Sequence, residues 1–318
     1  RANSLKAKNS KVSITKSIEL YEKAVEIDPT YADAYAFLGH AHLVSMGVSI
    51  AYPKEAIPKA KSAHEKCLEI DPNHPAALAG LSELAISYEW DIKKGKSLLD
   101  RALKINPKDP EVIISYGAYY MAIGDSKNMA AMALRGIESD PKSAFIHQVY
   151  AVAEYFNENM EQAEKHNLIA LSLSPTFQWA IHERSVILLD SNNFEEAEKL
   201  LLQGIKDDPD NPVTVMSLGV TYWNWGRKEE AYKLLSDLLH RSHSEFIKAD
   251  IIARFYSAMG EHDKAIEWVR KMKERKEQAF IHMHRHPWFK DLYKLEECKA
   301  LYKEAGLYET LFQYRINK

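Results

Sequence analysis

The sequence predicts an all-α protein, a right-handed α-solenoid built from stacked helix–turn–helix repeats. Two observations carry this prediction. Prolines recur every 34 residues, and so do alanines, at Pro107, Pro141, Pro175 and Pro209 and at Ala163, Ala197, Ala231 and Ala265. Between these markers the sequence is amphipathic with helical spacing. A fixed period of this length is typical of helix pairs that stack on their neighbours, so we expect about seven to eight pairs.

Each repeat ends in a short segment that stops its second helix. A polar residue precedes a proline in EIDPTYADAY, EIDPNHPAAL, KINPKDPEVI, ESDPKSAFIH, SLSPTFQWAI and KDDPDNPVTV. Proline cannot continue a helix, and it disfavours helical angles in the residue before it. A new helix follows within two or three residues, often with Asp, Ser or Pro at its start. These segments therefore predict the boundaries between repeats.

Small side chains recur where neighbouring helices must touch. Position 8 of the repeat holds Gly39, Ser82, Gly117, Ala151, Ser185, Gly219 and Ala253. Position 20, near the start of the second helix, is mostly alanine, and position 27 is mostly small. Large apolar residues such as Leu38, Tyr116 and Leu218 occupy position 7 beside them. Small against large lets helices interlock at native density.

The elements are expected in this order. Residues 1–31 form a partial first repeat, mainly its second helix at 16–27. Seven repeats fill residues 32–279, and residues 280–318 form a connection and a capping helix, with amphipathic character over 287–313. The repeats start near Ala32, Pro75, Pro110, Ala144, Gln178, Pro212 and Phe246.

Two intervals depart from the period. Pro29 and Pro72 are 43 residues apart, and Pro72 and Pro107 are 35 apart. Insertions in solenoids fall in loops, often on one face. The simplest interpretation of the longer interval is an extended second helix that starts near Pro53.

The pattern resembles the tetratricopeptide repeat. That family places Leu at position 7, Gly at 8, Tyr at 11, Ala at 20 and 27, and Pro at 32. The best local matches are YADAYAFLGHAH (31–42), NPVTVMSLGVTYWNWGRKEEAYKLL (211–235) and YSAMGEHDKAIEWV (256–269). The stretches SYEWDIKKGKSLLDRALKINP and GEHDKAIEWVRKMKERKEQAFIHMHRHPWFKDLYKLEECKALYKEAGL further resemble the C-terminal repeat region of bacterial signalling and transcription regulators. In those proteins a helix-turn-helix, cyclase or kinase domain precedes the repeats, so we interpret the chain as part of a longer protein.

Composition narrows the function classes. The chain has 42 basic and 45 acidic residues with a net charge of −3, so we expect no direct contact with nucleic acid. No apolar run approaches the ~20 residues that span a bilayer, which favours a cytoplasmic protein. The sequence contains no phosphate-binding glycine loop, HExxH motif or nucleophile elbow. We therefore expect no enzyme activity, no cofactor and no metal.

A segment with three histidines is a weak candidate for a metal site. His282, His284 and His286 alternate, and in an extended strand they would face one side and could chelate zinc, copper or nickel. A polar connection is the simpler interpretation. The two cysteines, Cys67 and Cys298, cannot form a zinc quartet, and Cys67 falls in a packing position that predicts an inert buried thiol.

The candidate binding site is the concave face, which the first helix of each repeat lines. Residues at its groove-facing positions are mostly apolar or aromatic: Phe145, Gln148, Tyr155, Trp179, His182, Met216, Trp223, Asp250 and Arg254. Such residues are typical interface anchors. Two interpretations stay open, a groove that holds a peptide and a tightly curved stack that buries these side chains against each other. The Lys and Asn positions that chaperone-binding repeats use for a peptide carboxylate hold other residues here.

The expected function is a non-catalytic protein-interaction or sensory module that binds a peptide segment or a partner domain. That partner includes the region preceding this chain in the same protein. The alternative is a substrate-recruiting arm of a transferase or kinase whose catalytic domain lies elsewhere. A third hypothesis is small-molecule sensing near Trp179 and Trp223.

Overall fold

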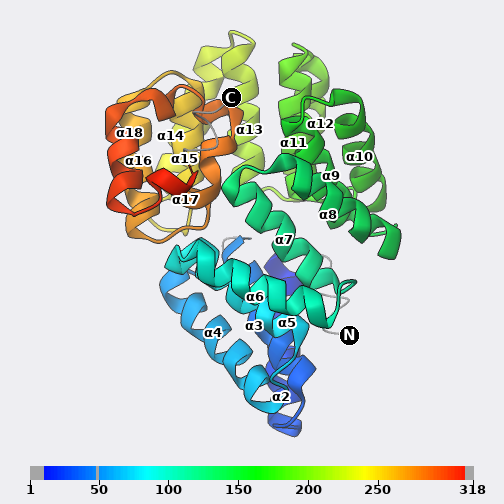
Figure 1. The fold of residues 1–318 in the computed structure, drawn as a ribbon. Helices are drawn as coiled ribbons and strands as arrows, with labels where there is room; N and C mark the ends of the chain where they lie inside the picture. Colours follow the sequence, from blue (N-terminus) through cyan, green and yellow to red (C-terminus); the bar gives the residue numbers. More distant parts are fainter. Residues whose placement is uncertain (1–10, 48–49, 312–318) are drawn as a thin grey trace. The chain divides into compact units, whose positions relative to one another are not determined.

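The computed structural model describes residues 11–47 and 50–311, and its regular elements there are helices without any strand (Figure 1). The predicted all-α stack of helix pairs is confirmed. The helices pack into two compact units, residues 1–119 with 275–278 and residues 120–274 with 279–318. Among the described residues no helix is both long and apolar enough to cross a membrane.

The first unit begins with α2 (Lys11–Ile27) and continues in pairs. Its further helices are α3 (Ala32–Gly47), α4 (Pro53–Ile70), α5 (Pro75–Leu84), the π-helix η1 (Ala85–Glu89) and α6 (Ile92–Ile105). Helix α7 (Pro110–Ile123) starts in this unit and ends in the second. The His64 ring fills the space left by two glycines, Gly39 at position 8 of its repeat and Gly80 on α5, since a Cβ on either would lie 2.5 or 2.1 Å from it.

Both departures from the period have a local explanation in the first unit. The longer interval extends the helices, because α3 has 16 residues and α4 has 18, against 13 in α9 and 14 in α10. The predicted start of the second helix at Pro53 is confirmed. The single extra residue lies in the π-helix, where the backbone N–H of Asp91 reaches the carbonyl of Ala85. A π-helix closes its turns one residue later, so it absorbs one residue without breaking the helix.

The second unit repeats the same pair of helices with one irregular start. Its elements are α8 (Ser126–Ser139), α9 (Ala144–Phe156), α10 (Met160–Leu173), α11 (Gln178–Asp190), α12 (Phe194–Asp207), α13 (Pro212–Asn224), α14 (Lys228–Arg241), α15 (Ala249–Ala258) and α16 (His262–Glu274). Helix α15 starts at Ala249, later than the predicted Phe246. His243 replaces the proline of the other repeats, and a turn through Glu245 takes the place of the first helical turn.

A left-handed residue marks the turn inside six successive repeats. Positive φ angles of 62°, 80°, 64°, 56°, 86° and 77° occur at Trp90, Gly124, Glu158, Asn192, Gly226 and Gly260, each 34 residues after the last. Glycine adopts this conformation without steric cost, whereas other L-residues are strained by about 1–2 kcal/mol. The repeat geometry therefore imposes this angle even where the side chain opposes it.

The C-terminal segment departs most from expectation. The single amphipathic helix predicted over 287–313 is wrong as far as residue 311. The segment instead contains α17 (Ala279–His282), three 3₁₀ turns η2 (Met283–Arg285), η3 (Pro287–Phe289) and η4 (Leu292–Lys294), and the short helix α18 (Glu296–Glu304), which packs on α16. Extended backbone at His286 and Leu295 interrupts it. The turns η3 and η4 between these breaks bury Phe289, Leu292 and Tyr293.

Candidate interaction site

In the second unit, six of the nine predicted groove residues lie in three places and the other three lie apart from these. His182, Asp250 and Arg254 meet in one polar network, and Phe145 and Trp179 pack together 5.4 Å apart between ring centroids. Tyr155 lies in a separate pocket. The remaining three, Gln148, Met216 and Trp223, join none of these groups.

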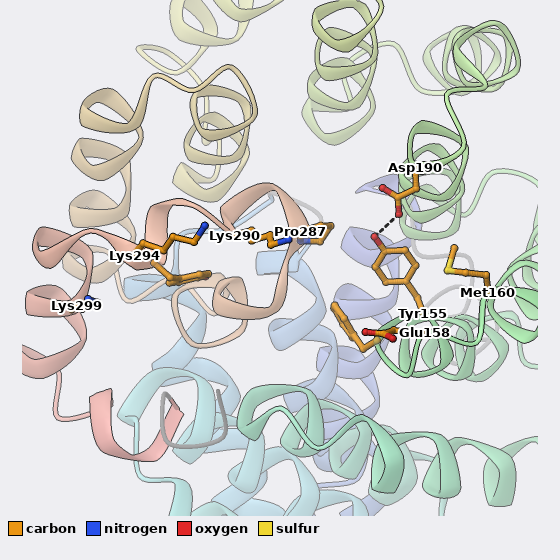
Figure 2. A pocket seen from close by; sticks show the side chains of 10 residues that line it. Tyr155, Glu158, Met160, Asp190, Pro287, Lys290, Lys294 and Lys299 are labelled. Carbon is orange, nitrogen blue, oxygen red and sulfur yellow. Dashed lines mark hydrogen bonds between the residues drawn. The ribbon is translucent and has the colours of Figure 1, made fainter. Parts of the chain in front are cut away.

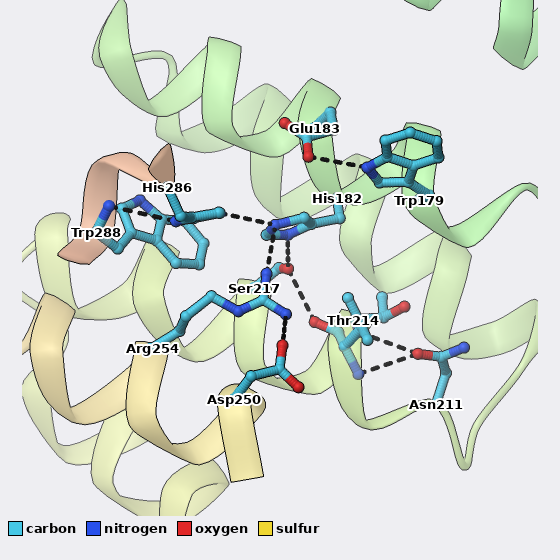
Figure 3. A network of polar contacts seen from close by, with 11 residues as sticks. Trp179, His182, Glu183, Asn211, Thr214, Ser217, Asp250, Arg254, His286 and Trp288 are labelled. Atoms are coloured by element: carbon cyan, nitrogen blue, oxygen red, sulfur yellow. Dashed lines mark hydrogen bonds and ion pairs between the residues drawn. The ribbon is translucent and has the colours of Figure 1, made fainter. Parts of the chain in front are cut away.

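The polar network receives part of the C-terminal segment (Figure 3). The rings of His182 and His286 stack with centroids 5.5 Å apart, and Trp288 meets the His182 ring edge-on at 5.3 Å. The Ser257 hydroxyl donates to the backbone carbonyl of Trp288 at 2.6 Å, while the backbone N–H of Trp288 donates to His286 Nδ1 at 3.3 Å. The chain's own segment therefore covers this part of the predicted groove.

The hydrogen bonds define which ring nitrogens carry protons. The Ser217 hydroxyl donates to the carbonyl of Val213 at 2.8 Å, so His182 Nδ1–H donates to Ser217 Oγ at 2.7 Å. His182 Nε2 then accepts from Arg254 Nη1 at 3.1 Å and from His286 Nε2 at 3.3 Å. Burial, and then the nearby Arg254 charge, hold the pKa of both imidazoles well below the ordinary value.

Arg254 also carries the one buried ion pair of this network. Its Nη2 lies 2.5 Å from Oδ2 of Asp250, one helical turn away on α15. Burial opposes ionisation of Asp250, but the guanidinium outweighs it and lowers the pKa of the carboxyl. This pairing orients Arg254 toward His182.

An aromatic cluster lies at the N-terminal ends of α9 and α11. Phe145, Phe177 and Trp179 contact one another, with Phe145 and Phe177 centroids 6.1 Å apart. The indole N–H of Trp179 donates to Glu183 at 3.0 Å. Desolvation raises the pKa of Glu183 to about 6, although this hydrogen bond works against the rise. The cluster is half-buried and its rings mainly fill space against each other.

The three remaining predicted groove residues pack against other parts of the protein. Gln148 is fully buried and accepts a hydrogen bond from Asn167 at 2.9 Å, and Met216 is fully buried in the core. Trp223 packs edge-on against Tyr232 at 5.7 Å and lies under the ammonium of Lys228. Tight stacking therefore buries part of the predicted inner stripe, which was one of the two interpretations of the sequence.

A pocket of about 850 Å³ opens between the repeats and the C-terminal segment (Figure 2). One wall comes from the ends of α9 and α11 and the turn between α9 and α10, and the other from residues 287–299. Its lining residues are Tyr155, Phe156, Glu158, Met160, Asp190, Pro287, Lys290, Tyr293, Lys294 and Lys299. The Tyr155 hydroxyl donates to Asp190 at 2.7 Å, and burial together with this bond raises the pKa of the phenol.

Sequence reasoning identified Tyr155 but missed the opposite wall. Lys290 and Lys294 lie one helical turn apart in sequence, a spacing that could have indicated a basic face. Nothing in the local sequence, however, indicates that this segment faces α9. The pocket exists only because the C-terminal segment folds back along the inside of the repeats.

The three alternating histidines do not form the extended strand that metal binding would need. Residues 279–285 are helical, and His284 Nδ1–H donates to the carbonyl of Ile281 at 2.9 Å. Within residues 11–47 and 50–311, no three His, Cys, Asp or Glu side chains gather as metal ligands would. Cys67 and Cys298 are buried, and burial raises the pKa of each thiol to about 12, as expected of inert cysteines.

Comparison with known proteins supports the repeat assignment. A family model of the TPR repeat matches residues 11–43. Among solved structures, the human IFIT1 dimer with PPP-AAAA aligns over 96% of this chain and 67% of its own, with 16% identity and a TM-score of 0.62. PilF of Pseudomonas aeruginosa aligns over 67% of this chain and 93% of its own, with 18% identity and a TM-score of 0.51. PilW, a type IV pilus biogenesis factor, aligns over 67% and 94%, with 15% identity and a TM-score of 0.54.

At these identities the likeness concerns the fold. No curated protein matches the sequence. The 34-residue helix pairs, the family match and the solved structures together support a tetratricopeptide-repeat protein.

Proposed function

We propose that this chain is a protein-interaction module without catalytic activity of its own. Its second unit would hold a peptide segment of a partner protein in the pocket between α9, α11 and the C-terminal segment. The pocket carries this proposal, because its volume of about 850 Å³ lies within the range of ligand-binding clefts and its lining includes four aromatic or thioether side chains. Such side chains with a few polar groups are typical of peptide-binding surfaces.

The chemistry of the unit favours binding over catalysis. The titratable groups of the polar network, His182, Arg254 and Asp250, are engaged with one another and covered by the C-terminal segment. In the pocket the Tyr155 hydroxyl and the Asp190 carboxylate are engaged in a mutual hydrogen bond. A role in a bacterial regulator, with the preceding region of the same protein as partner, stays a prediction, as does a cytoplasmic location.

A displayed library of random short peptides, selected on the purified chain, tests the proposal. We expect enriched peptides whose affinity falls by about tenfold or more in Tyr155→Ala, because an aromatic side chain in such a pocket is a typical hot spot. Tyr232→Ala is the matched control, since Tyr232 is an exposed tyrosine that donates to a carboxylate, Glu261, outside the pocket. Absence of any enriched peptide, or equal binding by the two variants, would refute the pocket as the site.

A further inference from the structure

The two walls of the pocket differ in charge. The repeat wall contributes the carboxylates of Asp190 and Glu158, and the C-terminal segment contributes the ammonium groups of Lys290, Lys294 and Lys299. Figure 2 shows Lys290 beside Pro287 on the segment that faces Tyr155 and Glu158 across the pocket. A ligand lying between these walls therefore meets negative charge on one side and positive charge on the other.

The acidic wall is already partly neutralised by the protein. Asp190 accepts the hydroxyl proton of Tyr155 at 2.7 Å, so one of its oxygens is engaged. Glu158 is exposed to solvent in the turn between α9 and α10, where water screens its charge. Neither carboxylate is placed to bind a cation strongly.

The lysine wall keeps its charge available. Lys290 forms no ion pair with any residue in the described part of the chain. Lys294 and Lys299 pair only with Asp291 and Glu296 three residues earlier, at 2.6 Å each, and all four groups are at least partly exposed. Exposed pairs of this kind contribute little to stability, so a ligand carboxylate can replace them at low cost.

Aromatic and apolar side chains form the rest of the pocket. Tyr155, Phe156 and Met160 lie on the repeat wall, with Met160 exposed, and Pro287 and Tyr293 lie opposite. An apolar side chain of a ligand would bury itself here, while its charged neighbours along the chain would reach the rim.

We propose that the pocket selects peptide segments in which an aromatic or aliphatic residue is flanked by Asp or Glu. The apolar side chain enters between Tyr155 and Tyr293, and the flanking carboxylates pair with Lys290, Lys294 and Lys299. This inference rests on the proposed function and adds the chemical class of the ligand. The C-terminal segment then determines specificity as well as closing the groove.

Fluorescence polarisation with three labelled peptides tests the selection. Each peptide has a central Trp in a flexible Gly/Ser frame, flanked by Glu in the first, Gln in the second and Lys in the third. We expect the Glu peptide to bind about tenfold more tightly than the Gln peptide at low salt, and the Lys peptide to bind most weakly. Raising the salt to about 0.3 M should remove most of this difference, because exposed charges are screened.

Charge reversal in the protein identifies the lysines. The double variant Lys290→Glu/Lys294→Glu should lose the preference for the Glu peptide and gain affinity for the Lys peptide. The control Lys199→Glu/Lys233→Glu changes the net charge equally at exposed positions of α12 and α14, outside the pocket, and should bind as the wild type does.

The outcomes separate this inference from the function on which it rests. Equal affinity for all three peptides, abolished by Tyr155→Ala, would overturn the acidic selection and leave peptide binding intact. Loss of the preference in the control variant would also overturn it, since the effect would then be one of net charge. Binding of none of the peptides together with tight, Lys290-dependent binding of a short RNA would overturn both.

Discussion

The packing of α13 against α15 gives the sharpest test of the repeat architecture. Gly219 lies at position 8 of its repeat, and a Cβ built on it would lie 2.0, 2.5 and 3.0 Å from ring atoms of Phe255. Ordinary contacts begin near 3.4 Å, and the Phe255 side chain is fully buried. The ring therefore has to move by more than an ångström within a packed core.

The expected magnitude follows from two opposing contributions. Overpacking a core by one methyl group costs about 1–3 kcal/mol and occasionally more. Replacing glycine by alanine inside a helix recovers about 1 kcal/mol. Because the contacts at Gly219 are much closer than those of a tolerated insertion, we expect Gly219→Ala to lower the free energy of unfolding by about 2 kcal/mol.

Urea unfolding followed by far-UV circular dichroism measures the effect. Gly204→Ala is the matched control, because its Cβ would lie 3.2 Å from the Thr214 methyl and 3.5 Å from Ile181, contacts that small shifts can relieve. We expect this control to change stability by less than about 1 kcal/mol. Adding Phe255→Leu to Gly219→Ala should recover part of the loss. Equal stability of the Gly219→Ala variant and the wild type would refute the interlocking of small and large residues at position 8.

Two further predictions concern backbone strain and pH. Glu158→Gly should raise the free energy of unfolding by about 1 kcal/mol, because Glu158 has a φ of 64°, whereas Lys165→Gly, inside α10, should lower it by a similar amount, both measured by urea unfolding. Stability should fall as the pH drops below about 6.5, because burial depresses the pKa of His182 and His286 in the folded protein and the unfolded chain then binds more protons. Glu183, with its pKa raised to about 6, acts in the opposite direction, since its contribution is lost as the pH rises through that value. A stability profile equally steep in His182→Gln/His286→Gln and in the wild type would contradict the assignment to these imidazoles.

The sequence predicted most helix boundaries because their signals are local. Six of the seven predicted repeat starts, from Ala32 to Pro212, coincide with the first residue of a helix. The one that differs, at Phe246, lacks the proline that stops the preceding helix in the other repeats. The extra residue before Trp90 was visible as a longer interval, but its accommodation as a π-helix was not.

The candidate site was only partly predictable. Groove-facing positions were inferred from the repeat register, which included His182, Asp250 and Arg254 but did not predict that they meet. It could not show that Met216 is fully buried, because the degree of burial depends on how closely successive helix pairs approach. The repeat register also did not indicate that Lys290 and its neighbours form the second wall of the pocket.

By itself the sequence determined the period, the helix pairs and the small residues at which they interlock. These features depend on residues within one or two turns of each other, or on one 34-residue neighbour. Only the tertiary structure decided that His286 meets His182, 104 residues away, and that the pocket forms between α9 and the C-terminal segment. Such contacts arise when a non-repetitive segment packs against the repeats and buries its own apolar side chains there, and the 34-residue period does not encode where that segment runs.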